Sequence, residues 1–148
     1  MNIEEVLKMW KEDSIIDDLK LDDTTIRMAR IHSKYLELIT IAKMRRKRKD
    51  LEYKTLLKDK WLYYNGKLSK EQIDEFNWEY DPFGGLNKPL KGDMNYYYDA
   101  DTDIQKSQAA LEYAKVLIET LEEIMNTIRW RHQNIGNIIK WRAFESGA

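Results

Sequence analysis

Residues 43–64 contain the side chains best suited to binding a ligand. This stretch contains nine basic residues and three acidic ones, so its net charge is +6, whereas the whole chain carries a formal charge of −1. Cations that hold phosphates and flat rings that stack on unpaired bases are the groups that bind a single nucleic-acid strand. The basic residues are Lys43, Arg45, Arg46, Lys47, Arg48, Lys49, Lys54, Lys58 and Lys60, and the aromatic ones at the C-terminal end of the stretch are Trp61, Tyr63 and Tyr64.

The charge of this stretch is compatible with several kinds of surface. The basic residues could form a solvated helix surface, contact an acidic protein or lie against an anionic membrane. A run of one sign repels itself, which favours a bound ligand of opposite charge. A membrane-bound helix needs a wide apolar face, whereas residues 45–49 place basic side chains on every side of a helix. Nucleic acid is therefore the favoured ligand, and an acidic protein bound by a helical scaffold is the alternative.

The elements that must position this stretch are predicted to be long helices in one domain, residues 1–148. The chain is 34% charged and has only six glycines and two prolines, a composition typical of an all-α fold. Residues 1–66 would form N-terminal helices: a short one over 3–11, and a long one from caps at 22–24 to Tyr64, ended by Gly66. Helical spacing predicts that the long helix buries Met28, Ile31, Tyr35, Leu38 and Ala42.

Residues 67–100 are predicted to form one long irregular loop region. Ser69 and Gln72 have the spacing of a capping box, which predicts a short helix after Ser69. Both prolines and three glycines fall within residues 81–93, a composition typical of a surface loop. The three tyrosines at 96–98 favour an extended segment.

The C-terminal part, residues 101–148, is predicted to be a coiled-coil-like oligomerisation helix capped by residues 101–103. Apolar residues recur with heptad spacing over about four heptads, and His132 is the one polar exception. So long a seam in a small chain predicts contacts with other copies as well as with the chain's own long helix. Its positions are Leu111, Ala114, Ile118, Leu121, Met125, Ile128, Ile135 and Ile139.

No catalytic residue, cofactor or metal centre is predicted, and we expect no enzyme activity. The chain has no cysteine, and His32 and His132 have no partner at metal-ligand spacing. No nucleophile stands beside a base. The N-terminus lacks the features of a signal peptide, and no apolar run reaches the length of a membrane span, so we expect an intracellular protein.

An acidic motif before the last helix invites a calcium-binding interpretation. Asp99, Asp101 and Asp103 have the spacing of the first ligands of a calcium loop. Ile104 and Ala110, however, stand where such a loop needs glycine and glutamate. These carboxylates are therefore predicted to cap the helix that follows.

Several short motifs, taken in order, resemble the UvsY family of bacteriophage recombination mediators over nearly the full chain. They are Ser-Lys-Tyr-Leu at 33–36, the basic pair Lys58 and Lys60, Tyr-Tyr-Asn-Gly at 63–66, and Arg-Ala-Phe-Glu-Ser-Gly at 142–147, which is similar to the family's RAFEAG-like terminus. Residues 58–61 read Lys-Asp-Lys-Trp where the family's basic motif reads Lys-Ala-Arg-Leu.

This resemblance implies a ring-shaped homo-oligomer, a hexamer or heptamer, that binds single-stranded DNA in the cytoplasm of an infected bacterium. It also implies contacts with a phage single-strand binding protein and a phage RecA-like recombinase, which the ring would help to load onto covered strands. We expect no membrane contact. The charge of residues 43–64 and this resemblance together give the expected DNA-binding residues, which are Lys58, Lys60, Lys54, Arg45, Arg46, Lys47, Lys67, Trp61 and Tyr64. The alternative for Trp61, Tyr63 and Tyr64 is that one or more of them pack in the core.

Overall fold

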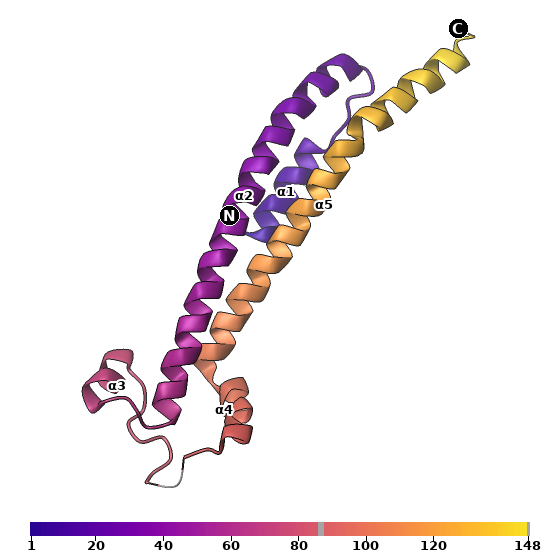
Figure 1. The fold of residues 1–148 in the computed structure, drawn as a ribbon. Helices are drawn as coiled ribbons and strands as arrows, with labels where there is room; N and C mark the ends of the chain where they lie inside the picture. The colour runs from indigo at the N-terminus through magenta and orange to yellow at the C-terminus, as the bar shows by residue number, and fades with distance from the viewer. Residues whose placement is uncertain (86–87, 148) are drawn as a thin grey trace. The chain divides into compact units, whose positions relative to one another are not determined.

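The fold is all-α, as predicted. The structure, a computed structural model, describes residues 1–85 and 88–147, and these residues contain helices and no β-strand (Figure 1). The elements are α1 (Ile3–Asp13), α2 (Leu21–Tyr64), α3 (Lys70–Phe76), the 3-10 helix η1 (Lys91–Asp93), α4 (Met94–Ala100) and α5 (Thr102–Glu145).

The chain divides into two compact units, and each is described by itself. The first unit contains Met1–Arg45 and Ala114–Ala148, and the second contains Arg46–Tyr113. The long helices α2 and α5 therefore each contribute residues to both units. That residues 1–148 form one domain stays a prediction.

The first unit has a core to which α1, α2 and α5 all contribute, and Figure 1 shows α1 beside the other two helices. Val6, Tyr35 and Leu121, one from each helix, are fully buried. The edge of the Trp10 ring packs on Tyr35, with 5.5 Å between ring centroids. Of the face predicted to be buried on α2, four residues are buried and Leu38 is half-buried against the same core.

Local hydrogen bonds explain where the helices begin and end. Helix α2 begins at Leu21, so Asp22 and Asp23 lie in its first turn rather than at its cap, and their charge favours the helix N-terminus. The capping box predicted at Ser69 and Gln72 is present at the start of α3. Gly66 ends α2 at a φ of 66°, the left-handed conformation that glycine adopts at low cost.

The prediction of an extended segment at the tyrosine run is wrong. Residues 94–100 form α4, which follows η1 directly and buries Met94 with 6% of its surface exposed. Asp101 ends α4 in an extended backbone conformation, and its carboxylate then accepts the backbone N–H groups of Asp103 and Ile104, each at 3.0 Å. This confirms capping as the role of Asp101.

Candidate nucleic-acid interface

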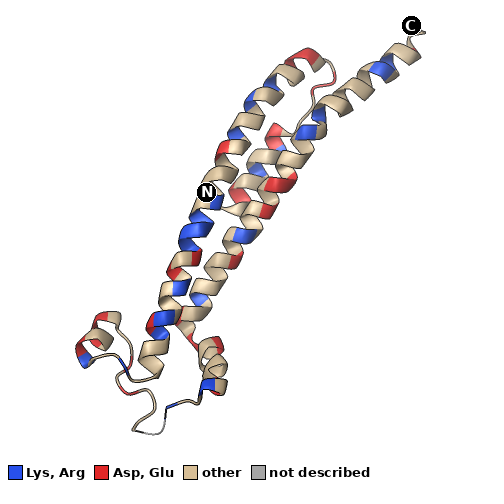
Figure 2. Cartoon of the chain, in the orientation of Figure 1, with Lys and Arg blue, Asp and Glu red and all other residues tan. Residues whose placement is uncertain are grey.

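The exposed cations of α2 in the second unit are concentrated on one stretch of the helix, residues 46–58. Figure 2 shows basic residues grouped along the middle of α2. Every member is exposed, so the surface is open to a ligand. We call the following six residues the basic surface: Arg46, Lys47, Arg48, Lys49, Lys54 and Lys58. Arg45, which precedes them on the same helix and belongs to the first unit, is also exposed.

The lysines of the basic surface have weak carboxylate partners. Asp50 Oδ2 lies 3.0 Å from Lys54 Nζ and 3.9 Å from Lys47 Nζ, so one carboxylate is shared by two lysines. Lys58 Nζ lies 3.4 Å from Asp59 Oδ1. Ion pairs between exposed groups typically contribute about 0–1 kcal/mol, so a phosphate can displace these carboxylates at little cost.

The arginines of the basic surface have no ion-pair partner among the described residues. Among the residues that the structure describes, no carboxylate lies within 4.0 Å of Arg46 or Arg48. An arginine guanidinium is always charged and can hold a phosphate through two parallel hydrogen bonds. Arg46 and Arg48 therefore have their full donor capacity available for a ligand.

Trp61 offers a partly exposed ring close to the basic surface in sequence. Its side chain is 41% exposed, and Lys67 Nζ lies 4.9 Å from its ring centroid. A ring of this exposure can stack on a base, and the lysine beside it can reach a phosphate. Trp61 and Lys67 thus fit the roles predicted for them.

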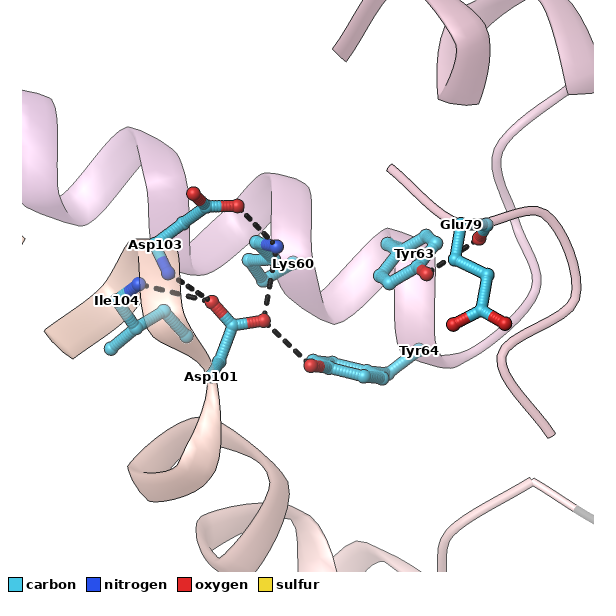
Figure 3. Close-up of polar contacts among 7 residues, drawn as sticks. All are labelled: Lys60, Tyr63, Tyr64, Glu79, Asp101, Asp103 and Ile104. Carbon is cyan, nitrogen blue, oxygen red and sulfur yellow. Dashed lines mark hydrogen bonds and ion pairs between the residues drawn. The ribbon is translucent and has the colours of Figure 1, made fainter. Parts of the chain in front are cut away.

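Lys60 lies in a different environment from its neighbour Lys58. It is 3% exposed, and its Nζ lies 3.0 Å from Asp101 Oδ2 and 2.9 Å from Asp103 Oδ2 (Figure 3). The same ammonium lies 3.9 Å from the ring centroid of Trp78. Two carboxylates and an aromatic face leave this ammonium no free side for a DNA phosphate.

Tyr64 and Tyr63 are held at the same end of α2. The Tyr64 hydroxyl donates to Asp101 Oδ2 at 2.6 Å, and the Tyr63 hydroxyl donates to the carbonyl oxygen of Glu79 at 2.6 Å (Figure 3). Burial, and then the bond to Asp101, raise the pKa of Tyr64 above its usual value. Tyr63 is buried with 6% exposure, which makes it a core residue.

The charge state of Asp101 follows from its hydrogen bonds. Burial alone would raise the pKa of this carboxyl, but the bonds from Tyr64, from the Ile104 N–H and from Lys60 outweigh burial and hold the pKa below its usual value. Asp101 is therefore ionised and joins the end of α2 to the start of α5. We call Lys60, Tyr64, Asp101 and Asp103 the buried ion-pair cluster.

The structure thus separates the predicted DNA-binding residues into two groups. Lys58, Lys54, Arg45, Arg46 and Lys47 are exposed, as are Lys67 and, in part, Trp61. Lys60 and Tyr64 belong to the buried ion-pair cluster. A phosphate contact does not fit the placement of Lys60, and the hydroxyl of the half-buried Tyr64 is bound to Asp101. Arg48 and Lys49 belong to the exposed group, although the set of DNA-binding residues inferred from the sequence did not include them; their charge was the only available signal.

Most residues predicted to mediate oligomerisation are instead buried by other residues of the same chain. Four of them belong to the core of the first unit, and Ile135 is also buried, with 3% exposure. Leu111 and Ala114 are half-buried. Ile139 differs, because 52% of its surface is exposed. The four core residues are Ile118, Leu121, Met125 and Ile128.

Three large apolar side chains near Ile139 were not singled out by the heptad pattern. Trp130, Trp141 and Phe144 are 58%, 62% and 73% exposed, and the last two rings stack with centroids 5.6 Å apart. They fall outside the a and d positions of the seam, and their spacing of eleven and three residues places them near one another around a helix. Ile139 precedes Trp141 by two positions and therefore points to the other side of the helix. We call Trp130, Trp141 and Phe144 the C-terminal apolar surface.

The described part of the chain offers neither a metal centre nor a membrane span. Within residues 1–85 and 88–147, no group of three or more histidine, cysteine, aspartate or glutamate side chains is placed to hold a metal ion. In the same residues, no helix combines the length and the apolar character needed to cross a membrane.

Comparison with known proteins agrees with this geometry. The chain is 27% identical over 147 residues to the recombination protein uvsY of Enterobacteria phage T4, and the match covers 99% of each chain. It is also similar to two crystal structures of the bacteriophage T4 recombination mediator protein UvsY. The lattice type II structure has a TM-score of 0.81 at 25% identity and covers 99% of this chain and 98% of that one. The lattice type I structure has a TM-score of 0.79 at 26% identity and covers 95% and 98%. Residues 9–148 match the family described as "Recombination, repair and ssDNA binding protein UvsY", and the chain therefore belongs to the UvsY family.

Proposed function

We propose that this protein is a recombination mediator that binds single-stranded DNA along the basic surface of α2. The observation that carries the proposal is the set of six exposed cations on one stretch of α2. Two of them are arginines without a carboxylate partner among the described residues. The strand's phosphates would replace the weakly held Asp50 and Asp59, and Trp61 would stack on a base beside Lys67. No set of groups suited to reading base edges accompanies the basic surface in the described residues, so binding would be independent of sequence.

The mediator role that we propose is non-enzymatic and depends on assembly. The C-terminal apolar surface would join copies into a ring, and the basic surfaces of the ring would hold one strand at several points. Linking weak sites in this way raises the effective concentration of each successive contact. A strand held on the ring would be released from the phage single-strand binding protein and presented to the phage RecA-like recombinase, in the cytoplasm of the infected bacterium.

The first test measures DNA affinity across a salt series, using fluorescence anisotropy of a labelled oligo-dT. If the six cations each neutralise one phosphate, the logarithm of the binding constant should fall with the logarithm of salt concentration at a slope of about −4. The double variant Arg46→Ala/Arg48→Ala should bind more weakly and reduce the slope to about −3. Lys8→Ala is the matched control, because Lys8 is an exposed lysine of α1 outside the basic surface.

Two outcomes would contradict the proposal. An unchanged slope in the arginine variant would place the strand elsewhere on the protein. No binding at low salt would remove DNA as the ligand, and the protein would then be better described as a helical scaffold whose basic helix binds an acidic protein.

A further inference from the structure

A second feature of the second unit is a cavity where the end of α2 meets the loop after α3. A cavity of about 200 Å³ lies there, and four of its lining residues are aromatic: Tyr63, Tyr64, Tyr80 and Phe83. Asp81 and Lys88 are its only charged lining residues in the described part of the chain. This size is sufficient for one ring or one long side chain of a ligand. We call the cavity the aromatic pocket.

Some cations of this unit lie over aromatic faces. Lys70 Nζ lies 5.5 Å from the ring centroid of Tyr80, which lines the pocket. The ammonium of Lys60 lies 3.9 Å from the ring centroid of Trp78. A cation over an aromatic face is attracted by the negative face of the ring, so the rings around the pocket are suited to a positive ligand.

The charge of the surrounding segment points in the same direction. Residues 67–100 contain seven acidic residues and four basic ones, a net charge of −3. All seven carboxylates are exposed, and none has a cation within 4.0 Å among the described residues. This negative field repels a DNA phosphate and attracts a cationic partner. The seven are Glu71, Asp74, Glu75, Glu79, Asp81, Asp93 and Asp99.

Lys88 shows that an ammonium can occupy the edge of the pocket. A Cβ atom added to Gly66 would lie 2.7 Å from Lys88 Cε and 2.9 Å from its Nζ, so the lysine lies directly over this glycine. Gly66 follows the C-terminus of α2, and the negative end of the helix dipole favours a positive charge there. No carboxylate within the described part of the chain pairs with Lys88.

We propose that the aromatic pocket binds an arginine or lysine side chain from a basic segment of a partner protein. The aromatic rings would surround the cation, the Asp81 carboxylate would pair with it, and the exposed carboxylates around the pocket would attract the rest of the segment. Lys88 would oppose the ligand's charge and keep the interaction weak and reversible. This site uses chemistry opposite to that of the basic surface, and its existence does not depend on DNA binding.

The test measures binding of a labelled peptide that has three arginines separated by glycines, by fluorescence anisotropy at low salt. Asp81→Asn removes the pocket's carboxylate and keeps a residue that tolerates the positive φ of 53° at this position. It should weaken peptide binding about threefold, and Lys88→Gln should strengthen it about threefold, as expected for one unit charge acting through water at close range. Asp74→Asn is the comparison variant: it removes an exposed carboxylate of α3 that does not line the pocket, so it should weaken peptide binding less than Asp81→Asn does.

Three outcomes would overturn the proposal. Equal weakening by Asp74→Asn and Asp81→Asn would show diffuse attraction with no role for the pocket. A nucleotide would be the occupant if Asp81→Asn strengthened oligo-dT binding and Lys88→Gln weakened oligo-dT binding while neither variant changed the affinity for the peptide. A change in oligomer size in either variant at unchanged peptide affinity, seen by sedimentation, would identify a second copy of this chain.

Discussion

Lys58 and Lys60 lie two positions apart on one helix and have different chemical environments. Lys58 is exposed and weakly paired, whereas Lys60 is buried between two carboxylates and an aromatic ring. Positions two apart on an α-helix point about 200° away from each other, so the same basic motif presents one lysine to solvent and the other to the protein interior. Charge alone therefore does not determine which lysines can reach a ligand.

Replacing Lys60 tests its structural role. Lys60→Met keeps most of the side-chain volume but leaves the Asp101 carboxylate, whose side chain is 5% exposed, without its cation. Breaking a buried pair in this way should lower the free energy of unfolding by about 3–5 kcal/mol, measured by urea denaturation. Lys58→Met, at a lysine whose side chain is 67% exposed, should change stability by less than about 1 kcal/mol. Equal losses in the two variants would contradict the assignment.

Replacing Asp50 should change the affinity for DNA in a predictable direction. Its carboxylate pairs with both Lys47 and Lys54, so it partly neutralises the basic surface. Asp50→Asn should therefore raise the affinity for oligo-dT about threefold at low salt, and the gain should shrink as salt screens the charge. Glu112→Gln, which also removes one exposed carboxylate of the second unit, is the control. An equal gain in both variants would indicate a general effect of net charge.

The exposure of individual residues was predictable where the sequence places charged side chains on every side of a helix. The run at 45–49 has charge on all sides of the helix and had to face solvent, as it does. The burial of Lys60 was not predictable, because its partners Asp101 and Asp103 lie about forty residues away and only the folded chain brings them together. The same reason applies to Tyr64, whose hydroxyl is bound to Asp101.

At the scale of elements, the local signals were reliable. The capping box at Ser69, the cap at Asp101 and the end of α2 at Gly66 all depend on contacts between residues a few positions apart, which a sequence specifies directly. The tyrosine run misled because tyrosine's preference for strands reflects its packing against neighbouring strands, and no strand is available in the described residues. The burial of Met94 accompanies a helix there instead.

Two glycines at the long helices give opposite predictions for the same substitution. Gly136 lies within α5, and an added Cβ would meet nothing within 4 Å, so Gly136→Ala should raise the free energy of unfolding by about 1 kcal/mol. Gly66 has a φ of 66° and lies under Lys88, so Gly66→Ala should lower it by about 1 kcal/mol or more. Thermal unfolding followed by circular dichroism measures both. A loss of stability in Gly136→Ala would indicate that this glycine is needed for a contact with another molecule.

At the scale of the whole molecule, a heptad pattern does not say which surface its apolar residues will meet. The seam of α5 satisfies the spacing of a coiled coil, yet Ile118, Leu121, Met125 and Ile128 pack in the core of their own unit. A sequence cannot distinguish a partner helix in the same chain from one in another copy, because both present the same apolar groove. What the fold leaves exposed is a better guide to assembly, and in α5 this is the C-terminal apolar surface.

The C-terminal apolar surface is therefore where we expect copies of the chain to meet. Three aromatic side chains with 58–73% exposure share one side of the last part of α5, a concentration of apolar area that single chains rarely leave to water. The double variant Trp141→Ser/Phe144→Ser should shift sedimentation at micromolar concentration towards the monomer, while helix content stays unchanged. Because the proposed strand binding depends on linked sites, the same variant should also bind a long oligo-dT at least about tenfold more weakly. Its affinity for a strand short enough to contact only one basic surface should be almost unchanged.

Tyr113→Ser, at an aromatic residue of α5 that is 46% exposed but lies outside the C-terminal apolar surface, is the control. An oligomer that persists in the double variant would place the contact between copies on another face, and an equal loss of affinity for short and long strands would show that DNA binding does not depend on assembly.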